Sequence, residues 1–315
     1  MTETVTAGQR VAPGTTPVRR ARSRRRRRDT LIGLLSVLPA LVLVAALMWY
    51  PLVTTVYHGF TDWDGVVTKW VGLDNYRQLF GDGDIWQYLR TNLVFFLSIP
   101  VILVISLVVA VLLHEQTPGA RFFRSVYYLP CMLSVAVVGL LMRSMFAPDG
   151  MANRSLSAVG LGGLATDWLA YTVTSFLVLI LAFYWQTLGQ GALIFLAGLS
   201  AMPSSVVEAA QVDGAGWWRR LFRIVLPMQT PAISYFLVTN TAYVFVGLFS
   251  LIFTVTRGGP GSTTVPLDYE IYLSAFQSGD LGYASAVSVV LLVLVSIIAW
   301  LQVRNFDLYS RQGGR

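Results

Sequence analysis

Six long apolar segments alternate with polar stretches along the chain. They fall at about residues 31–57, 91–113, 126–146, 169–198, 232–256 and 283–303, and their central parts contain no Asp, Glu, Lys or Arg. A membrane-spanning helix needs roughly 20 mostly apolar residues, so each segment is long enough to cross a bilayer. The pattern predicts an all-α polytopic membrane protein with six transmembrane helices.

Composition strengthens this interpretation and excludes several kinds of site. Hydrophobic residues make up 55% of the 315 residues and charged residues only 12%. The single cysteine, Cys131, excludes a disulfide framework or a cysteine-based metal site within one chain. The sequence has no GxxxxGK[ST] phosphate-binding loop. We therefore expect no cofactor and no metal on this chain.

The net charge of +7 comes from an arginine-rich segment at residues 1–29. Nine arginines lie there, and Arg24–Arg28 form an unbroken run, whereas residues 30–315 hold 14 basic and 14 acidic residues. This composition predicts a disordered tail. A nucleic-acid-binding tail is one interpretation. We favour the other, an anchor that keeps the N-terminus in the cytoplasm, and expect no nucleic-acid partner.

Charges in the loops predict the orientation of the six segments. Stretches rich in arginine alternate with stretches rich in aspartate and glutamate, and the arginine-rich ones follow the second, fourth and sixth segments. Because cytoplasmic loops carry excess Lys and Arg, both termini are expected in the cytoplasm. The expected division is a tail at 1–29, a transmembrane domain at 30–307 and a C-terminal tail at 308–315.

The polar stretch between the fourth and fifth segments predicts two short helices joined by a turn. Ser205 can cap the first helix, and Glu208 three residues later completes a capping box. Gly214 and Gly216 supply the turn, because glycine tolerates positive φ where other residues do not. Residues 217–225 then predict a second helix, which Pro227 should stop.

This stretch resembles the cytoplasmic coupling loop of ABC importer permeases. The resemblance is carried by Glu208-Ala209-Ala210, Asp213-Gly214-Ala215 and Leu226-Pro227, with their spacing intact. Two further stretches, Trp70–Phe80 and Gly258–Ala286, are similar to carbohydrate-type permeases of the maltose, glycerol-phosphate and multiple-sugar group. The resemblance extends from about residue 31 to the C-terminus.

The resemblance implies a transport subunit of the plasma (inner) membrane and not an enzyme. The loop at about 199–231 would dock into a partner ATPase through Glu208, Ala209, Ala210, Asp213 and Gly214. The implied partners are a second, different permease, two ATPase subunits that bind ATP and Mg, an extracytoplasmic sugar-binding protein and membrane lipid. The transported sugar would be delivered by that binding protein, and the sequence does not identify it.

Two other classes of function compete with this one. An ion-coupled secondary transporter of a small polar solute usually needs Asp, Glu or His inside the spans, and the central parts of these segments have none. Sodium sites built from neutral oxygens keep that alternative open. A membrane-embedded enzyme would need paired carboxylates or a histidine cluster at membrane depth, and the sequence shows neither.

Polar residues within the fourth and fifth segments are candidates for the sugar path. Asn240 and Tyr243 share one helical face with Phe236 and Gly247, and they offer hydrogen bonds and an aromatic ring. Tyr184 and Gln186 lie near the glycines of the fourth segment. The alternative is that Asn240 and Gln186 join neighbouring helices by hydrogen bonds, which we slightly favour for Gln186.

Overall fold

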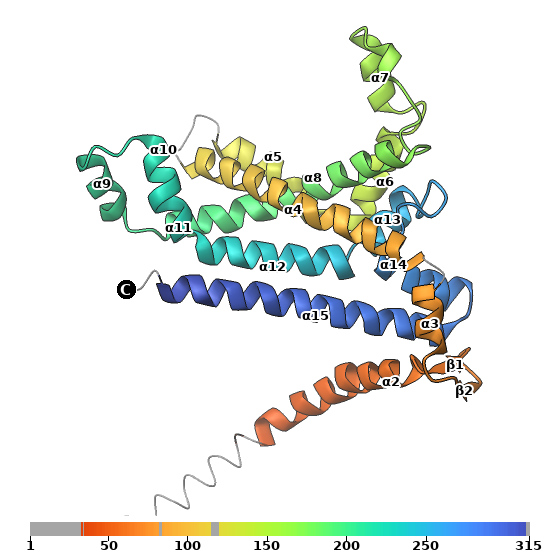
Figure 1. Ribbon diagram of the computed structural model, residues 1–315. Coiled ribbons are helices and arrows are strands. Elements are labelled where there is room, and N and C mark those ends of the chain that lie inside the picture. Colours follow the sequence, from red (N-terminus) through yellow and green to blue (C-terminus); the bar gives the residue numbers. More distant parts are fainter. Residues whose placement is uncertain (1–32, 34, 82–83, 115–119, 313–315) are drawn as a thin grey trace, which may run out of the picture. The chain divides into compact units, whose positions relative to one another are not determined.

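The computed structural model describes residue 33 and residues 35–81, 84–114 and 120–312 (Figure 1). The expected N-terminal tail, at 1–29, lies outside the described residues. The chain divides into two compact units, Met1–Thr54 and Thr55–Arg315. The boundary falls within helix α2, and each unit is described by itself.

The described part of the first unit is one long apolar helix. A continuous helix runs over Leu35–His58 and is apolar and long enough to cross a membrane. It includes the π-helical turn η1 (Ala45–Trp49) and continues into α2 (Tyr50–His58). Its side chains from Leu35 to Val53 are exposed. A helix that is apolar all round and uncovered is suited to a lipid environment or to another protein.

The second unit is almost entirely helical, with one small antiparallel hairpin. In chain order its elements are β1 (Thr61–Trp63), β2 (Thr68–Trp70), α3 (Asp74–Gly81), α4 (Asp84–His114), α5 (Ala120–Met132), α6 (Val135–Met145), α7 (Met151–Ala158), η2 (Gly162–Leu164), α8 (Thr172–Ser200), α9 (Ser204–Val212), α10 (Trp217–Arg220), η3 (Leu221–Val225), α11 (Leu226–Met228), α12 (Thr230–Val246), α13 (Phe249–Val255), α14 (Leu267–Tyr272), η4 (Leu273–Gln277) and α15 (Leu281–Gln312). The hairpin pairs Thr61 with Trp70.

Four helices of the described residues could each cross a membrane unbroken, and two bent pairs raise the number to six. The unbroken ones are Leu35–His58, Asp84–His114, Thr172–Ser200 and Leu281–Arg304. The bent pairs are Ser125–Met132 with Val135–Met145, at 107°, and Trp217–Met228 with Thr230–Val246, at 65°. The prediction of an all-α membrane protein is confirmed at this level.

The third and fifth expected segments are not single helices. Residues 126–146 are divided at Leu133 and Ser134, where the Ser134 hydroxyl oxygen accepts the backbone N–H of Val137 at 3.3 Å and starts α6. Residues 232–256 are divided at Gly247, after which α13 starts at Phe249. A side chain at 247 would overlap the Tyr243 ring, 2.7 Å away. Local capping and close packing therefore override the apolar continuity of both segments.

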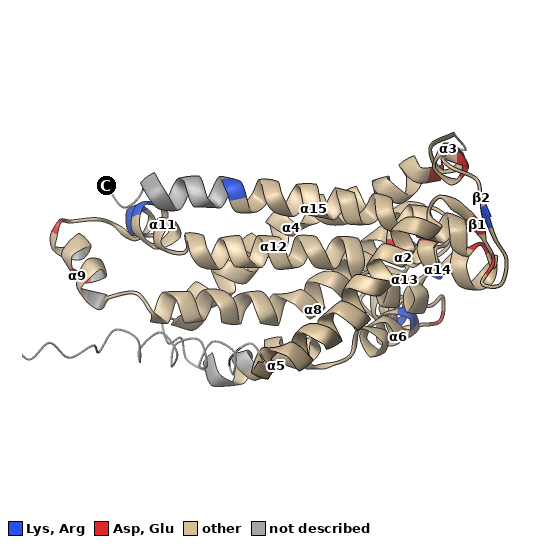
Figure 2. Ribbon diagram, turned by 90° about the horizontal axis from the view of Figure 1, so that it is seen from below, with Lys and Arg blue, Asp and Glu red and all other residues tan. Residues whose placement is uncertain are grey.

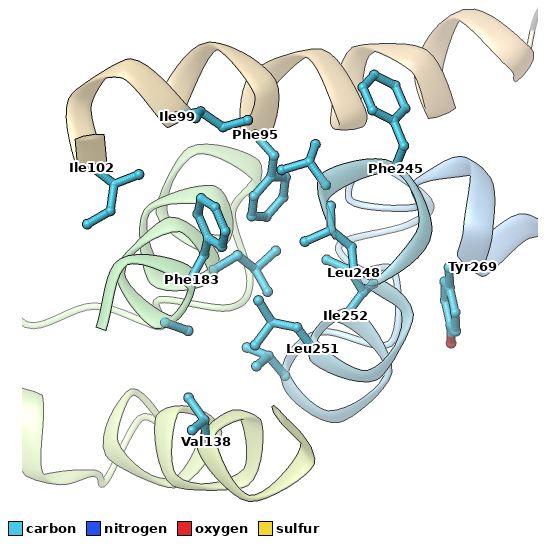
Figure 3. Packing of buried hydrophobic residues seen from close by; sticks show 14 of the residues in the cluster. Phe95, Ile99, Ile102, Val138, Phe183, Phe245, Leu248, Leu251, Ile252 and Tyr269 are labelled. Carbon is cyan, nitrogen blue, oxygen red and sulfur yellow. The ribbon is translucent and has the colours of Figure 1, made fainter. Parts of the chain in front are cut away.

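The core of the second unit lies where these broken helices meet α4 and α8. Figure 3 shows Phe95 of α4, Phe183 of α8 and Leu251 of α13 pointing toward one another. All three side chains are completely buried. Gly139 of α6 lets α13 approach so closely that a Cβ at 139 would overlap the Thr254 side chain. The two broken segments thus pack against each other through their second halves.

Asn92 joins three elements of the second unit. Its side-chain amide donates to the Val244 carbonyl of α12 at 2.8 Å, and its side-chain oxygen accepts the N–H of Leu267 at 3.0 Å. Asn92 belongs to α4 and is fully buried. Both of the backbone groups that it meets lie at helix ends, where carbonyl and N–H groups lack partners within the helix.

Charged residues lie mainly at the two ends of the second unit. Figure 2 shows Lys, Arg, Asp and Glu near α3, the hairpin and α14 at one end, and near α9 and α11 at the other. The long stretches of α4, α8 and α12 between them carry no charge colour. This separation is the one expected for helices whose middle parts face hydrocarbon.

Candidate coupling loop and transport path

Helix α9 ends in a glycine-dependent cap, as the sequence indicates. The N–H of Ala215 donates to the carbonyl of Ala210 at 2.9 Å, across the end of the helix. Gly214 has a φ of +73°, the left-handed conformation that glycine adopts without a Cβ penalty. This pattern is a Schellman cap, and it fixes the direction in which the chain leaves α9.

The candidate coupling residues lie on or just after α9. Glu208, Ala209, Asp213 and Gly214 are exposed, and Ala210 is buried. Glu208 and Asp213 therefore present two carboxylates to the surface, and Ala209 is the one exposed alanine of the pair. This exposed surface fits docking to a second protein, and the docking itself stays a prediction.

The predicted start of the first short helix is wrong by two residues, because a cap at Ser205 would start the helix at residue 206. α9 begins at Ser204, and the backbone N–H of Val206 donates to the Pro203 carbonyl at 3.2 Å. Ser205 is consequently inside the first turn and not the residue that precedes it. Pro203 ends the preceding stretch and sets the position from which the helix can start, since proline fixes φ.

The prediction that Pro227 stops the second short helix is also wrong. The helix runs through Trp217–Arg220, the π-turn Leu221–Val225 and Leu226–Met228 before it bends. The N–H of Leu226 donates to the carbonyl of Leu221, which is the wider spacing of a π-turn. A π-turn just before a proline changes the hydrogen-bond ladder so that the missing N–H of Pro227 is tolerated.

The loop returns to the bundle at Gln229, a residue that the sequence interpretation did not single out. Its side chain is 1% exposed. It packs directly on Gly198 in the last turns of α8, where a Cβ would overlap the Gln229 amide. The start and the end of the loop therefore contact each other, through Gly198 and Gln229. The two helices that carry the loop, α8 and α12, also pack against each other.

Tyr184 and Gln186, the two candidates for the sugar path on α8, point toward different neighbours. The Tyr184 hydroxyl donates to the Ser98 carbonyl of α4 at 2.8 Å. The Gln186 amide lies 3.5 Å from the Leu133 carbonyl, at the break between α5 and α6. Both side chains are half-buried.

Asn240 and Tyr243, the two candidates on α12, are enclosed within the second unit. Asn240 is 4% exposed and donates to the Phe236 carbonyl of its own helix at 2.9 Å. The Tyr243 ring stacks on Phe183, with ring centres 5.8 Å apart. Its hydroxyl is buried and has no hydrogen-bond partner among the described residues. Tyr243 is therefore a group whose hydrogen-bonding capacity is available to another conformation or to a ligand.

A groove of about 600 Å³ lies between α4, α12 and α15, and it is lined by apolar side chains together with Arg90 and Gln302. Its lining includes none of the four candidates. Their role in a sugar path stays a prediction.

Asp268, in α14, is another functional candidate that the sequence interpretation missed. Its Oδ2 accepts the N–H of Phe249 at 2.7 Å, at the first residue of α13. Its Oδ1 is buried without a partner among the described residues. Burial raises the pKa of Asp268 to about 7, and the N–H group of Phe249 opposes that rise. In the sequence, Asp268 is an acidic residue in the polar stretch before the sixth apolar segment. Arguments about membrane topology count such a residue only as loop charge.

Within the described residues, no three His, Cys, Asp or Glu side chains gather closely enough to hold a metal ion. The structure does bring titratable groups into contact with other elements and neighbours. Asp268 accepts the N–H at the start of α13, and Glu270 accepts the Ser274 hydroxyl at 2.7 Å.

Comparison with known sequences places these features in a family. The family described as "Binding-protein-dependent transport system inner membrane component" matches residues 85–307. Among curated proteins, the chain is 35% identical to the probable ABC transporter permease protein YesP of Bacillus subtilis, over 88% of this chain and 91% of that protein. It is 30% identical to the lactose transport system permease protein LacF of Rhizobium radiobacter, over 90% and 96%.

A further relative and a solved structure agree with this result. The sn-glycerol-3-phosphate transport system permease protein UgpA of Yersinia pestis is 32% identical over 86% of this chain and 92% of that protein. A chain in the crystal structure of a bacterial ABC transporter involved in import of the acidic polysaccharide alginate matches with a TM-score of 0.80. It is 22% identical and covers 91% of this chain and 98% of that chain. At that identity the likeness concerns the fold.

Proposed function

This chain belongs to the family of binding-protein-dependent transport system inner membrane components, and on that premise we propose that it is one half of the channel of an ATP-driven sugar importer. It is a multi-pass membrane protein and a permease component of sugar ABC importers. The proposed cargo is a sugar delivered from outside by a binding protein. The ion-coupled alternative loses its support, because the family works with binding proteins.

The single observation that carries the coupling role is the geometry of the α9 loop. A capped helix with two exposed carboxylates is held between α8 and α12, and its exit direction is fixed by Gly214. A rigid, exposed helix tied at both ends to long helices can transmit the movement of a partner to those helices. We place a partner ATPase at this surface, with ATP and Mg bound by that ATPase and not by this chain.

The proposed orientation follows from the loop charges. α9 and the three arginines of residues 217–223 would lie in the cytoplasm, together with both termini. The number of spans would be six, and the fifth would start after the bend that separates Trp217–Met228 from Thr230–Val246. A second, different permease would complete the channel. Because this chain supplies half of the path, its polar residues meet sugar only in the assembled channel.

ATP acts on such a channel by shifting a balance between two conformations. A ligand changes that balance only to the extent that it binds one conformation better than the other. The ATPase pair closes when it binds ATP, and α9 is the part of this chain that would follow it. The helices α8 and α12 would then move with the ends of the loop.

The test substitutes the residues that set the geometry and charge of the loop. Gly214→Val forces a β-branched residue into positive φ, at a cost of about 1–3 kcal/mol, and misdirects the chain after α9. Glu208→Lys reverses the charge of the docking surface. We expect both variants to insert normally but to lose ATPase association and sugar uptake, measured by co-purification and by uptake in reconstituted vesicles.

Matched controls lie in the same loop. Gly216 has a negative φ of −60° and open space around it, so Gly216→Ala should keep both activities. Glu208→Gln keeps the shape without the charge and should fall between Glu208→Lys and the unchanged protein. Normal uptake in both Gly214→Val and Glu208→Lys would overturn the coupling role.

A further inference from the structure

Gln229 occupies an unusual position for a polar side chain. It lies at the 65° bend between the helices Trp217–Met228 and Thr230–Val246. Its side chain is 1% exposed, and neither its Oε1 nor its Nε2 has a hydrogen-bond partner among the described residues. Its backbone groups, in contrast, are satisfied, since the N–H donates to Val225 at 3.0 Å and to Leu226 at 3.1 Å.

The packing around this amide leaves it little freedom in the described conformation. Gly198 of α8 lies against it, and a Cβ there would overlap its Oε1 and lie 3.0 Å from its Cδ and Nε2. Gly198 directly precedes the coupling loop, and Gln229 lies near the end of that loop. The amide is therefore clamped at the point where the loop enters and leaves the bundle.

A buried amide without partners is costly, because it has lost its hydrogen bonds to water and gained none in the protein. A Leu or Met side chain would fill the same space without that cost. The described conformation is thus disfavoured relative to any conformation in which the amide meets a donor and an acceptor. The π-turn at Leu221–Val225 is a second departure from regular α-helix close to the bend.

We propose that Gln229 is a positioning residue that sets the balance between two conformations of the coupling loop. In the conformation described here its amide is unpartnered. In the other, a changed bend between α11 and α12 lets the amide form hydrogen bonds. The inference rests on the proposed function, because it concerns the motion of α9. It assigns that motion to the bend at Gln229, and it assigns the preference for one conformation to the Gln229 amide.

The first test removes the amide but keeps its length. Gln229→Met has no unsatisfied polar atoms in the described conformation and no hydrogen bonds to gain in the other. We expect the thermal unfolding midpoint of the nucleotide-free complex to rise. We also expect the basal rate of ATP hydrolysis in the complex to fall about tenfold, since the balance moves toward the described conformation.

A matched control is available on α15. Gln302 is partly buried, and its Nε2 donates to the Thr241 hydroxyl at 2.8 Å. It lies outside the junction of the loop. Gln302→Met removes this hydrogen bond and also a buried Oε1 that has no partner among the described residues. Because these two effects oppose each other, the unfolding midpoint should rise less than in Gln229→Met, and the rate of ATP hydrolysis should stay unchanged.

The second test uses the clamp itself. Gly198→Ala should displace the Gln229 side chain, move the balance away from the described conformation and raise ATP hydrolysis several-fold. Shortening that side chain, in Gly198→Ala with Gln229→Ala, should bring the rate part of the way back, because the added methyl group then has room. Recovery in the double variant would show that residues 198 and 229 are energetically coupled. A general loss of stability would not produce such a recovery.

The outcomes separate this inference from the proposed function. If the unchanged permease fails to associate with any ATPase chain, the proposed function is wrong. If association and ATP hydrolysis are normal and Gln229→Met matches the unchanged protein in both measurements, only the role of Gln229 is wrong. A lower unfolding midpoint in Gln229→Met would likewise overturn it, since the amide would then be contributing to the described conformation.

Discussion

At the scale of single residues, Asn240 and Tyr243 test whether enclosed polar groups on α12 belong to the sugar path. Asn240 already has a partner within its helix, whereas the Tyr243 hydroxyl has none among the described residues. If both residues line the path, Asn240→Ala and Tyr243→Ala should each reduce uptake at least several-fold while assembly and basal ATP hydrolysis persist. Uptake, co-purification and ATP hydrolysis of the reconstituted complex measure the three quantities.

The alternative for these residues gives a different result. If Asn240 joins helices, Asn240→Ala should reduce assembly and uptake together. Tyr243→Phe is the matched control, because it keeps the stacking on Phe183 and removes only the hydroxyl. Unchanged uptake in both alanine variants would exclude this face of α12 from the path.

Residues differ in how far the sequence alone could predict their role. Gly214 was predictable, because positive φ at a helix end has a strong preference for glycine. The continuation of the helix through Pro227 was not, because the π-turn that permits it has no clear sequence signature. Gln229 and Asn92 could not be assigned from sequence, since their importance depends on what lies around them after folding.

At the scale of elements, the start of α13 depends on the ionisation of a residue in α14. Burial holds the pKa of Asp268 near 7, above its ordinary value of 3.8. The folded protein therefore binds this proton more tightly than the unfolded chain does, and the free energy of unfolding should fall as the pH rises from about 4 to about 7. Above that range this group should add no further change.

The substitution Asp268→Asn should flatten that pH dependence, because the amide oxygen can still accept the Phe249 N–H and nothing titrates. Thermal unfolding of the purified protein between pH 4 and pH 8 measures the effect. Asp64→Asn is a control of opposite sign, since the N–H groups of Val67 and Val66 lower the pKa of the exposed Asp64. A pH dependence that is unchanged in Asp268→Asn would show that another group is responsible.

Apolar pattern predicted where helical segments exist better than where they break. The segment from 91 to 113 became part of one helix, α4, and even Pro100 did not interrupt it. The segments 126–146 and 232–256 were broken by a serine cap and by contact between Tyr243 and Gly247. Apolar run length reports suitability for the bilayer, whereas these breaks depend on a cap and a side-chain contact, three and four residues apart, that hydrophobicity does not report.

At the scale of the whole molecule, the charge pattern predicts which loops face the cytoplasm. Reporter fusions after residues 120, 215 and 310 should be cytoplasmic, and those near 70, 155 and 265 external, because arginine-rich loops stay inside. Paired enzymatic reporters, one active on each side of the membrane, make the measurement. An external position for residue 215 would contradict the coupling role of α9, since ATP is inside the cell.

The hydrogen bonds of Asn92 depend on the order in which the chain is synthesised. Its two partners lie 152 and 175 residues further along the chain. At a synthesis rate of about 5–20 residues per second, roughly 8–35 s separate the synthesis of Asn92 from that of those partners. During that interval the Asn92 amide must bind water or another protein, because an unsatisfied polar group is costly in hydrocarbon. The first half of this protein therefore enters the membrane unfinished, and the insertion machinery must shelter that amide until α12 and α14 arrive.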